Sequence, residues 1–75
     1  MILYKMDVLK ELKKAGYNQT ILRQRKLLSQ ATITALRNGD TIGIKSLNNI
    51  CLLLRCQPGD IIECKPTNDE KIKFF

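Results

Sequence analysis

The sequence predicts a mainly α-helical protein: a compact bundle of about five helices in a single domain, residues 1–75, with short β-strands near its two ends. Three observations predict this. The chain has 75 residues, too few for two hydrophobic cores. Apolar residues make up 44% and charged residues 27%, the balance of a globular protein and not of a disordered chain. Apolar side chains also recur three and four positions apart in several segments, and a capping residue precedes most of these segments.

A strand and a helix are expected in the first segment of the chain. Residues 1–5, MILYK, are rich in strand-forming side chains and are too few for a helix. Residues 7–15 carry apolar side chains at helical spacing, with lysines on the other side. Asp7 can cap this helix, and Gly16 can end it because glycine readily adopts a positive φ.

Two short helices with a three-residue connection are expected next. Asn18 is a good N-cap for a helix over residues 19–26. Ser29 can cap a further helix over residues 30–37, which Gly39 would end.

The second half of the chain predicts one longer helix and several short elements. Residues 44–54 repeat apolar side chains at helical spacing after Gly43, which would be the N-cap. Residues 57–60, QPGD, predict a single helical or tight turn. Residues 61–64 are expected to be extended, and residues 71–75, KIKFF, alternate as a short strand would.

Catalysis and metal binding find little support in the sequence. There is no His, no glycine-rich phosphate loop, and the seven acidic residues are scattered over separate elements. Cys51, Cys56 and Cys64 lack the spacing of zinc ligands, and Cys51 falls on an apolar helix face typical of a core residue. We therefore expect no enzyme, no metal, no cofactor and reduced thiols.

The sequence also argues against a membrane protein. No apolar run approaches the length of a membrane span. Charged residues interrupt the N-terminal segment where a signal peptide would need an apolar stretch, so the expected location is cytoplasmic.

The net charge of +6 is concentrated in one half of the chain. Residues 1–38 carry eight bases and two acids, whereas residues 39–75 carry five of each. This asymmetry favours a polyanionic partner, either nucleic acid or an anionic membrane surface. The alternative is a basic face that only contacts solvent.

Residues 18–39 predict a helix-turn-helix. Four apolar residues lie where such a pair needs them to fix the angle between its helices: Leu22, Leu28, Ile33 and Leu36. A generic pair of packed helices would give a similar pattern. The second helix, however, exposes the amide and hydroxyl groups of Gln30, Thr32 and Thr34, which can hydrogen-bond to base edges while Arg and Lys bind phosphate.

Residues 7–63 resemble the lambda-repressor-like, Cro/cI-type helix-turn-helix family, and the likeness is greatest to its small stand-alone regulators. The segments that carry the likeness are LKELKKAGYN (9–18), LRQRKLLS (22–29), TITALRNG (32–39) and LNNICLLLRCQPGDIIE (47–63). The resemblance implies a bundle of about five helices that binds double-stranded DNA with sequence specificity.

The resemblance also implies roles for individual residues. The positions that meet base edges in the major groove are occupied by Gln30, Ala31 and Ala35. The positions that contact phosphate are occupied by Gln19, Thr32 and Asn38. With the neighbouring polar and basic side chains, the full expected DNA-binding set is Gln19, Thr20, Arg23, Ser29, Gln30, Ala31, Thr32, Thr34, Ala35, Arg37 and Asn38.

Three features depart from the pattern of the family. Leu27 stands in the turn where many members have glycine, so it is expected to take the turn without the conformational freedom of glycine. Arg23 stands where many members have a small residue, and it is expected to point outward or to pair with an acid. Arg37 stands where many members of the family have Glu. Ala31 and Ala35 can contact thymine methyl groups but cannot hydrogen-bond to bases.

The sequence therefore predicts a transcriptional regulator, specifically a repressor that binds an inverted-repeat operator as a homodimer. Both ends of the chain and the fourth helix carry apolar surface, including Leu52 and Leu53, beyond what one core requires. We expect the terminal strands and this helix to form the dimer. The alternative is a protein-interaction module, such as an anti-repressor or accessory subunit, that keeps the helix-turn-helix shape without reading DNA.

Overall fold

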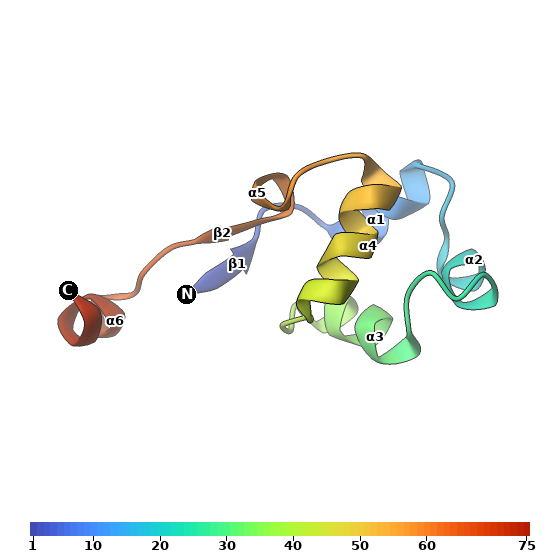
Figure 1. Ribbon diagram of the computed structural model, residues 1–75. Helices are drawn as coiled ribbons and strands as arrows, with labels where there is room; N and C mark the ends of the chain where they lie inside the picture. The colour runs from blue at the N-terminus through green and yellow to red at the C-terminus, as the bar shows by residue number, and fades with distance from the viewer.

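The computed structural model describes all 75 residues and shows a helical head from which a thin arm projects (Figure 1). We define the head as residues 6–61 and the arm as residues 1–5 and 62–75. The elements in chain order are β1 (Ile2–Tyr4), α1 (Val8–Lys14), α2 (Gln19–Gln24), α3 (Gln30–Asn38), α4 (Ile44–Leu54), α5 (Pro58–Ile61), β2 (Ile62–Cys64) and α6 (Asn68–Phe74). A mainly helical fold with short strands is confirmed, although there are six helices and not five. No helix combines the length and the apolar character that crossing a bilayer requires.

One apolar core holds the head together. In it, α1 contacts both α3 and α4, and α4 contacts α5. Every helix of the head and the loop before α3 contribute to the buried side chains, which are Val8, Leu12, Leu22, Leu28, Ile33, Leu47, Ile50 and Ile61. Three of the four predicted helix-turn-helix core residues are thus buried, whereas Leu36 is half-buried against the same core.

The three predicted N-caps are confirmed, and they explain where α1, α2 and α3 begin. Each side-chain oxygen accepts a hydrogen bond from the backbone N–H three residues further on, at 3.2 Å for Asp7, 2.9 Å for Asn18 and 3.2 Å for Ser29. Such a cap contributes about 1 kcal/mol by satisfying a donor that has no partner inside the helix.

The turn between α2 and α3 differs from the expectation in two respects. The helix α2 ends at Gln24, two residues before the predicted end. The residue with positive φ is Lys26, at 55°, and not Leu27. The physical reason is that Leu27 is half-buried against the core, so the exposed Lys26 takes the left-handed position instead. The carbonyl of Leu27 then accepts a hydrogen bond from Asn49 Nδ2 at 3.2 Å, which ties the turn to α4.

The helix α4 agrees with the prediction, and α5 forms the expected single turn but includes Ile61, which was expected to be extended. Gly43 is the N-cap of α4, and Pro58 occupies the first position of α5. The N–H of Gln57 donates to Asp60 Oδ2 at 2.9 Å, which closes the start of this single turn. Because α5 places Ile61 in the core, the chain leaves the head at a fixed point.

The arm begins where β1 and β2 pair antiparallel, with Ile2 opposite Cys64 and Tyr4 opposite Ile62. Two backbone hydrogen bonds of 2.8 Å extend the ladder at its ends. The two terminal strands pair with each other within one chain.

The prediction of a strand over residues 71–75 is wrong, because these residues belong to α6 and its C-cap. The helix begins with a capping box, in which Glu70 N–H donates to Thr67 Oγ1 at 3.1 Å and Thr67 N–H donates to Glu70 Oε1 at 2.9 Å. This reciprocal pair favours a helix, whereas a further strand would have no neighbour to satisfy its backbone. No residue of α6 is buried.

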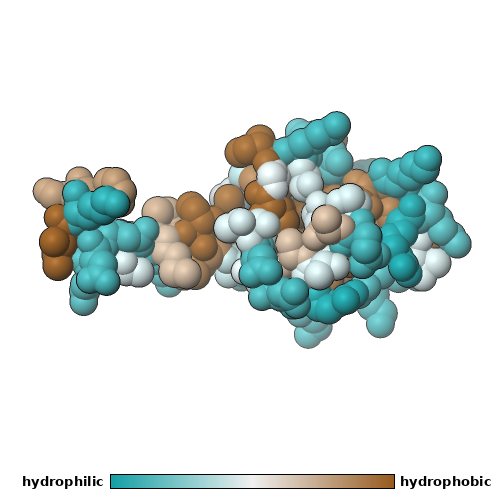
Figure 2. Space-filling model, turned by 90° about the horizontal axis from the view of Figure 1, so that it is seen from below, coloured by the Kyte–Doolittle hydropathy of each residue, from teal (hydrophilic) through white to brown (hydrophobic).

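The helix α6 lies at the far end of the arm, away from the head (Figure 1). The Met1 ammonium donates to Glu70 Oε1 at 2.7 Å and to the Lys65 carbonyl at 3.0 Å, which holds α6 near the start of β1. These contacts give the molecule its length of 45 Å against a width of about 20 Å in the other directions. Apolar surface gathers on the arm and at its tip (Figure 2).

Candidate nucleic-acid interface

The helices α2 and α3 form a helix-turn-helix whose angle is fixed from inside. Leu22 from α2, Leu28 from the turn and Ile33 from α3 are all buried in the same core. The Thr32 hydroxyl also lies 3.0 Å from the Ser46 hydroxyl of α4. The outer face of α3 is therefore presented by a rigid support, as base recognition requires.

The exposed face of α3 carries Gln30 and Thr34 as its hydrogen-bonding groups. The Gln30 amide donates to Thr34 Oγ1 at 3.3 Å, and Arg23 Nη1 donates to Gln30 Oε1 at 3.5 Å. These contacts orient the amide from both sides while the side chain remains exposed. Ala31 is exposed beside Gln30, and Ala35 is half-buried one turn further on.

Arg23 behaves as expected, since it is exposed and points away from the core. Besides its contact with Gln30, it donates through Nε to the Gln19 carbonyl at 3.4 Å. It forms no ion pair with an acid. Its positive charge therefore remains available on the same side of the molecule as the exposed face of α3.

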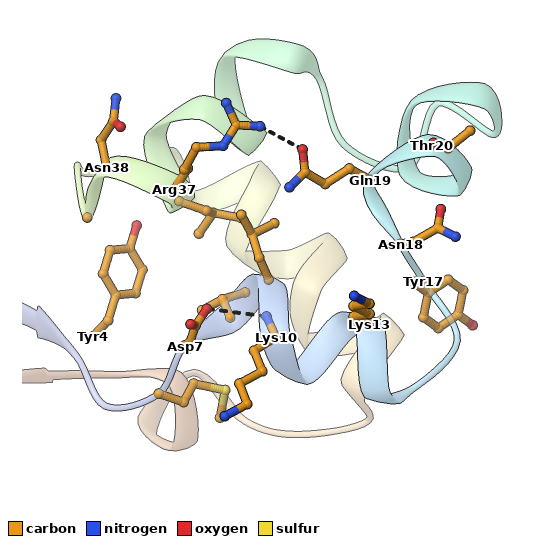
Figure 3. A pocket seen from close by; sticks show the side chains of 15 residues that line it. Tyr4, Asp7, Lys10, Lys13, Tyr17, Asn18, Gln19, Thr20, Arg37 and Asn38 are labelled. Atoms are coloured by element: carbon orange, nitrogen blue, oxygen red, sulfur yellow. Dashed lines mark hydrogen bonds between the residues drawn. The ribbon is translucent and has the colours of Figure 1, made fainter.

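A contact between α3 and α2 was not predicted. Arg37 Nη2 donates to Gln19 Oε1 at 2.6 Å (Figure 3). The two residues are 18 positions apart, and no sequence pattern signals their contact. Arg37 also has no acidic partner, so the contact orients its guanidinium without neutralising it.

A hollow of about 1030 Å³ lies next to this pair, between α1, the start of α2 and the end of α3. Lys10, Lys13 and Arg37 supply three cations to its lining, and Asp7 supplies the one acid. Tyr17 lines it as well, beside Asn18, and was not among the predicted site residues. In the sequence Tyr17 directly follows the helix end at Gly16, and this position does not indicate that its side chain lines a hollow.

The predicted DNA-binding residues come together on one helix pair and its connection. Most are exposed: Thr20, Arg23, Ser29, Gln30, Ala31, Thr34, Arg37 and Asn38. Three are half-buried: Gln19, Thr32 and Ala35. The expectation that Thr32 is exposed is wrong, because its hydroxyl lies 3.0 Å from the hydroxyls of both Ser29 and Ser46 and its side chain is half-buried between them. Contact of each residue with DNA stays a prediction.

The fold and the polar face of α3 define a helix-turn-helix domain, and comparison with known proteins identifies its family. The model of the Cro/C1-type HTH DNA-binding domain matches residues 8–67, and the chain belongs to this family. The resemblance inferred from the sequence is thereby confirmed.

The chain is also similar to a named bacterial protein. This relative is the uncharacterized HTH-type transcriptional regulator YozG of Bacillus subtilis (strain 168). The two are 36% identical over 70 residues, which cover 91% of this chain and 81% of the relative. No solved structure matches the chain significantly.

Proposed function

We propose that the protein is a transcriptional repressor that binds an inverted repeat in double-stranded DNA as a homodimer. The observation that carries this proposal is the exposed face of α3, where an oriented amide and a hydroxyl lie between two arginines that no acid neutralises. A face that only contacts solvent typically pairs its bases with acids along the helix. The name of the Bacillus relative, an HTH-type transcriptional regulator, supports the regulatory role.

In the proposed complex, α3 lies in the major groove. In this complex Gln30 bonds adenine N6 and N7 with its amide, and Thr34 adds a second polar contact. Ala31 and Ala35 are small enough to meet thymine methyl groups. Adenine would replace the two present partners of the Gln30 amide, which frees Arg23 for a phosphate.

The phosphate contacts are assigned to residues on both sides of α3. Gln19 and Arg37 reach the backbone as one unit, because they are already hydrogen-bonded to each other. The other polar side chains of the set act beside them: Thr20, Ser29, Thr32 and Asn38. Phosphate contacts fix the register of the protein on DNA, whereas the base contacts supply sequence specificity.

Selection of bound duplexes from a random pool tests the proposal. An enriched inverted repeat, with half-sites centred about 34 Å or one helical turn apart, would support both sequence-specific DNA binding and a homodimer with two-fold symmetry. If no duplex is enriched and no mobility shift appears with random duplex at low salt, the protein-interaction module becomes the better reading.

The homodimer is proposed to form through the arm and α4. Eight large apolar side chains are exposed: Met1, Ile2, Leu3, Ile44, Leu52, Ile72, Phe74 and Phe75. Their exposed area is on the order of 1,000 Å², comparable with the roughly 800 Å² that each partner buries in a specific interface.

A second copy is the occupant that fits this surface. The strand pair holds the apolar side chains of α6 away from the head that carries Ile44 and Leu52. A hollow of about 310 Å³ where the arm meets the head is lined by Ile2, Leu3 and Ile44 among others. We propose that α6 of one copy covers this apolar region of the other, and that the exchange is reciprocal.

Sedimentation at micromolar concentration tests the dimer. The full chain is expected to sediment as a dimer, and deletion of residues 66–75 should shift it towards monomer. Phe74→Ser should weaken the dimer in the same way, whereas Lys71→Ser on the same helix should not. A full chain that runs as a monomer, or a deleted one that stays dimeric, would rule this interface out.

A further inference from the structure

The corner between α4 and α5 holds two cysteines in a defined backbone geometry. The C-cap of α4, Arg55, adopts the left-handed conformation with φ 53° and ψ 48°. The Cys51 carbonyl accepts hydrogen bonds from the N–H of Arg55 and, at 3.0 Å, from the N–H of Cys56. The second bond is the one that closes a helix end of the Schellman type.

Helix ends of this type commonly bring together the two side chains that occupy the positions of Cys51 and Cys56, and the contact is normally apolar. In this chain both positions carry free thiols, and both are half-buried. A disulfide requires Cα atoms about 4.4–6.8 Å apart, and the backbone hydrogen bond between the two residues holds them at short range.

In a single copy of the protein, small molecules can reach this pair of thiols. Cys51 and Cys56 both line a surface hollow of about 720 Å³, together with Leu52 and Pro58. The third cysteine, Cys64, is exposed on β2 and does not line the hollow. The chain therefore contains one thiol pair and, on another element, one thiol that serves as a control.

We propose that Cys51 and Cys56 are a modification site, at which small-molecule disulfides oxidise the two thiols to an intramolecular disulfide. One thiolate attacks the small disulfide, which forms a mixed disulfide and releases one small thiol. The second thiolate attacks the protein sulfur of the mixed disulfide, which closes the bridge and releases the second small thiol. The protein loses two protons and two electrons, and the small disulfide gains them.

The local environment sets how the reaction depends on pH. Burial, the neighbouring Cys51 thiol and the carboxylate of Asp60 raise the pKa of the Cys56 thiol. Because the thiolate is the reactive form, oxidation is slow at neutral pH and accelerates as the pH rises.

The bridge would act at the base of the arm. In the reduced protein, backbone hydrogen bonds and packing against the core hold the end of α4, whereas in the oxidised protein a covalent bond also joins α4 to the segment that begins α5. Since α5 leads directly into β2, oxidation would add a covalent constraint at the corner that precedes the arm.

Intact-mass measurement tests the proposal, at a protein dilution where the chain is monomeric and after treatment with ~0.1 mM oxidised glutathione at about pH 8.5, near the ordinary thiol pKa. Cys64→Ser, which leaves only the pair, should give one species lighter by two hydrogens and free of glutathione. Adding Cys51→Ser or Cys56→Ser to it should instead leave one stable glutathione adduct. The bridged species should form at least ~10-fold faster than any doubly adducted one, because the second thiol attacks at a millimolar or higher effective concentration.

The outcomes that would overturn the proposal are distinct. Two persistent glutathione adducts on Cys64→Ser would mean that the thiols cannot reach each other. Two unreacted thiols would mean that the disulfide reagent cannot reach them. Peptide mapping that finds Cys64 bridged to either partner in the wild-type chain would show that another pairing is preferred. The Cys64→Ser measurement decides even where a double variant fails to fold.

Discussion

The head and the arm begin their helices with the same kind of local signal, yet they differ in what covers their apolar side chains. Ser29 caps α3 in the head as Thr67 caps α6 in the arm. The head buries eight apolar residues in one core, whereas α6 buries none and leaves Phe75 88% exposed. A capping box can therefore start a helix that buries no apolar side chain.

The head and the arm also differ in charge. The head carries nine bases and four acids, whereas the arm carries four bases and three acids. The head thus has the field that attracts a polyanion, and the arm has the apolar surface that attracts another apolar surface. This contrast supports the proposal that the head binds DNA and that the arm takes part in self-association.

The largest expected effect is on the free energy of unfolding, and it compares one isoleucine of the head with one of the arm. Ile33→Ala in the head should lower the free energy of unfolding by about 2–5 kcal/mol, because it leaves a cavity in a closed core. Ile72→Ala in the arm should change it by less than about 0.5 kcal/mol at a dilution where the protein is monomeric. Urea unfolding followed by circular dichroism measures both.

The effects of the two isoleucine substitutions should also depend differently on protein concentration. If α6 covers a second copy, the effect of Ile72→Ala should grow as the concentration rises and the dimer forms, whereas the effect of Ile33→Ala should be present at every concentration. A large effect of Ile72→Ala in the dilute monomer would mean that α6 packs on its own head, contrary to the structure.

The second expected effect is on the salt dependence of DNA binding. With about five phosphate contacts per protomer, the log–log slope of affinity against salt should be roughly −4 to −5, so a fourfold rise in salt weakens binding by roughly 250- to 1,000-fold per protomer. Mobility shifts over a range of salt concentrations measure the slope.

The chain that lacks residues 66–75 is the matched control for this slope. Residues 66–75 carry two bases and two acids, so their deletion should leave the slope per protomer unchanged even where the affinity falls. A slope near zero for the full chain on every duplex would contradict a phosphate-binding head.

Much of the head could be predicted because its signals are local. Asp7, Asn18 and Ser29 cap helices by hydrogen bonds within three residues, and Gly39 ends α3 with a φ of 75°. Such contacts are encoded in adjacent positions and do not depend on the rest of the fold.

Other features could not be predicted, for two different reasons. The contact of Arg37 with Gln19 joins residues on different helices, and only their packing creates it. The sequence does contain a signal for the start of α6, because Thr67 and Glu70 have the spacing of a capping box. The alternating residues 71–75 also fit a strand, and this second pattern favoured the wrong element.

The third expected effect separates base reading from positioning within the head. Gln30→Ala should lose about 1–3 kcal/mol of preference at one or two base pairs while leaving non-specific binding nearly unchanged. Gln19→Ala should weaken specific and non-specific binding together, because it loses a phosphate contact and releases Arg37. Titrations with the selected operator and with random duplex measure the two effects. Identical behaviour of the two variants would mean that α3 does not lie in the groove.

The smallest expected effect tests the joint between the two regions. The Tyr4 hydroxyl of β1 donates to the Asp40 carbonyl, directly after α3, at 2.6 Å. Tyr4→Phe removes this hydrogen bond and should lower the free energy of unfolding by about 1 kcal/mol at pH 8. Tyr17→Phe is the matched control, since the Tyr17 hydroxyl has no hydrogen-bond partner in the protein, and it should change little.

The pH dependence of this effect follows from the titration of Tyr4. Burial, and to a smaller extent Asp40, raise the pKa of the Tyr4 hydroxyl above its ordinary value of about 10. A group whose pKa is raised in the folded state stabilises it fully below the unfolded pKa, and this stabilisation is lost as the pH rises through the folded pKa. The difference between the wild-type chain and Tyr4→Phe should therefore be complete at pH 8 and shrink above about pH 10. Urea unfolding of the wild-type chain and of Tyr4→Phe, at pH 8 and again above about pH 10, measures this difference. An undiminished difference at the higher pH would mean that the contact between arm and head does not depend on this proton.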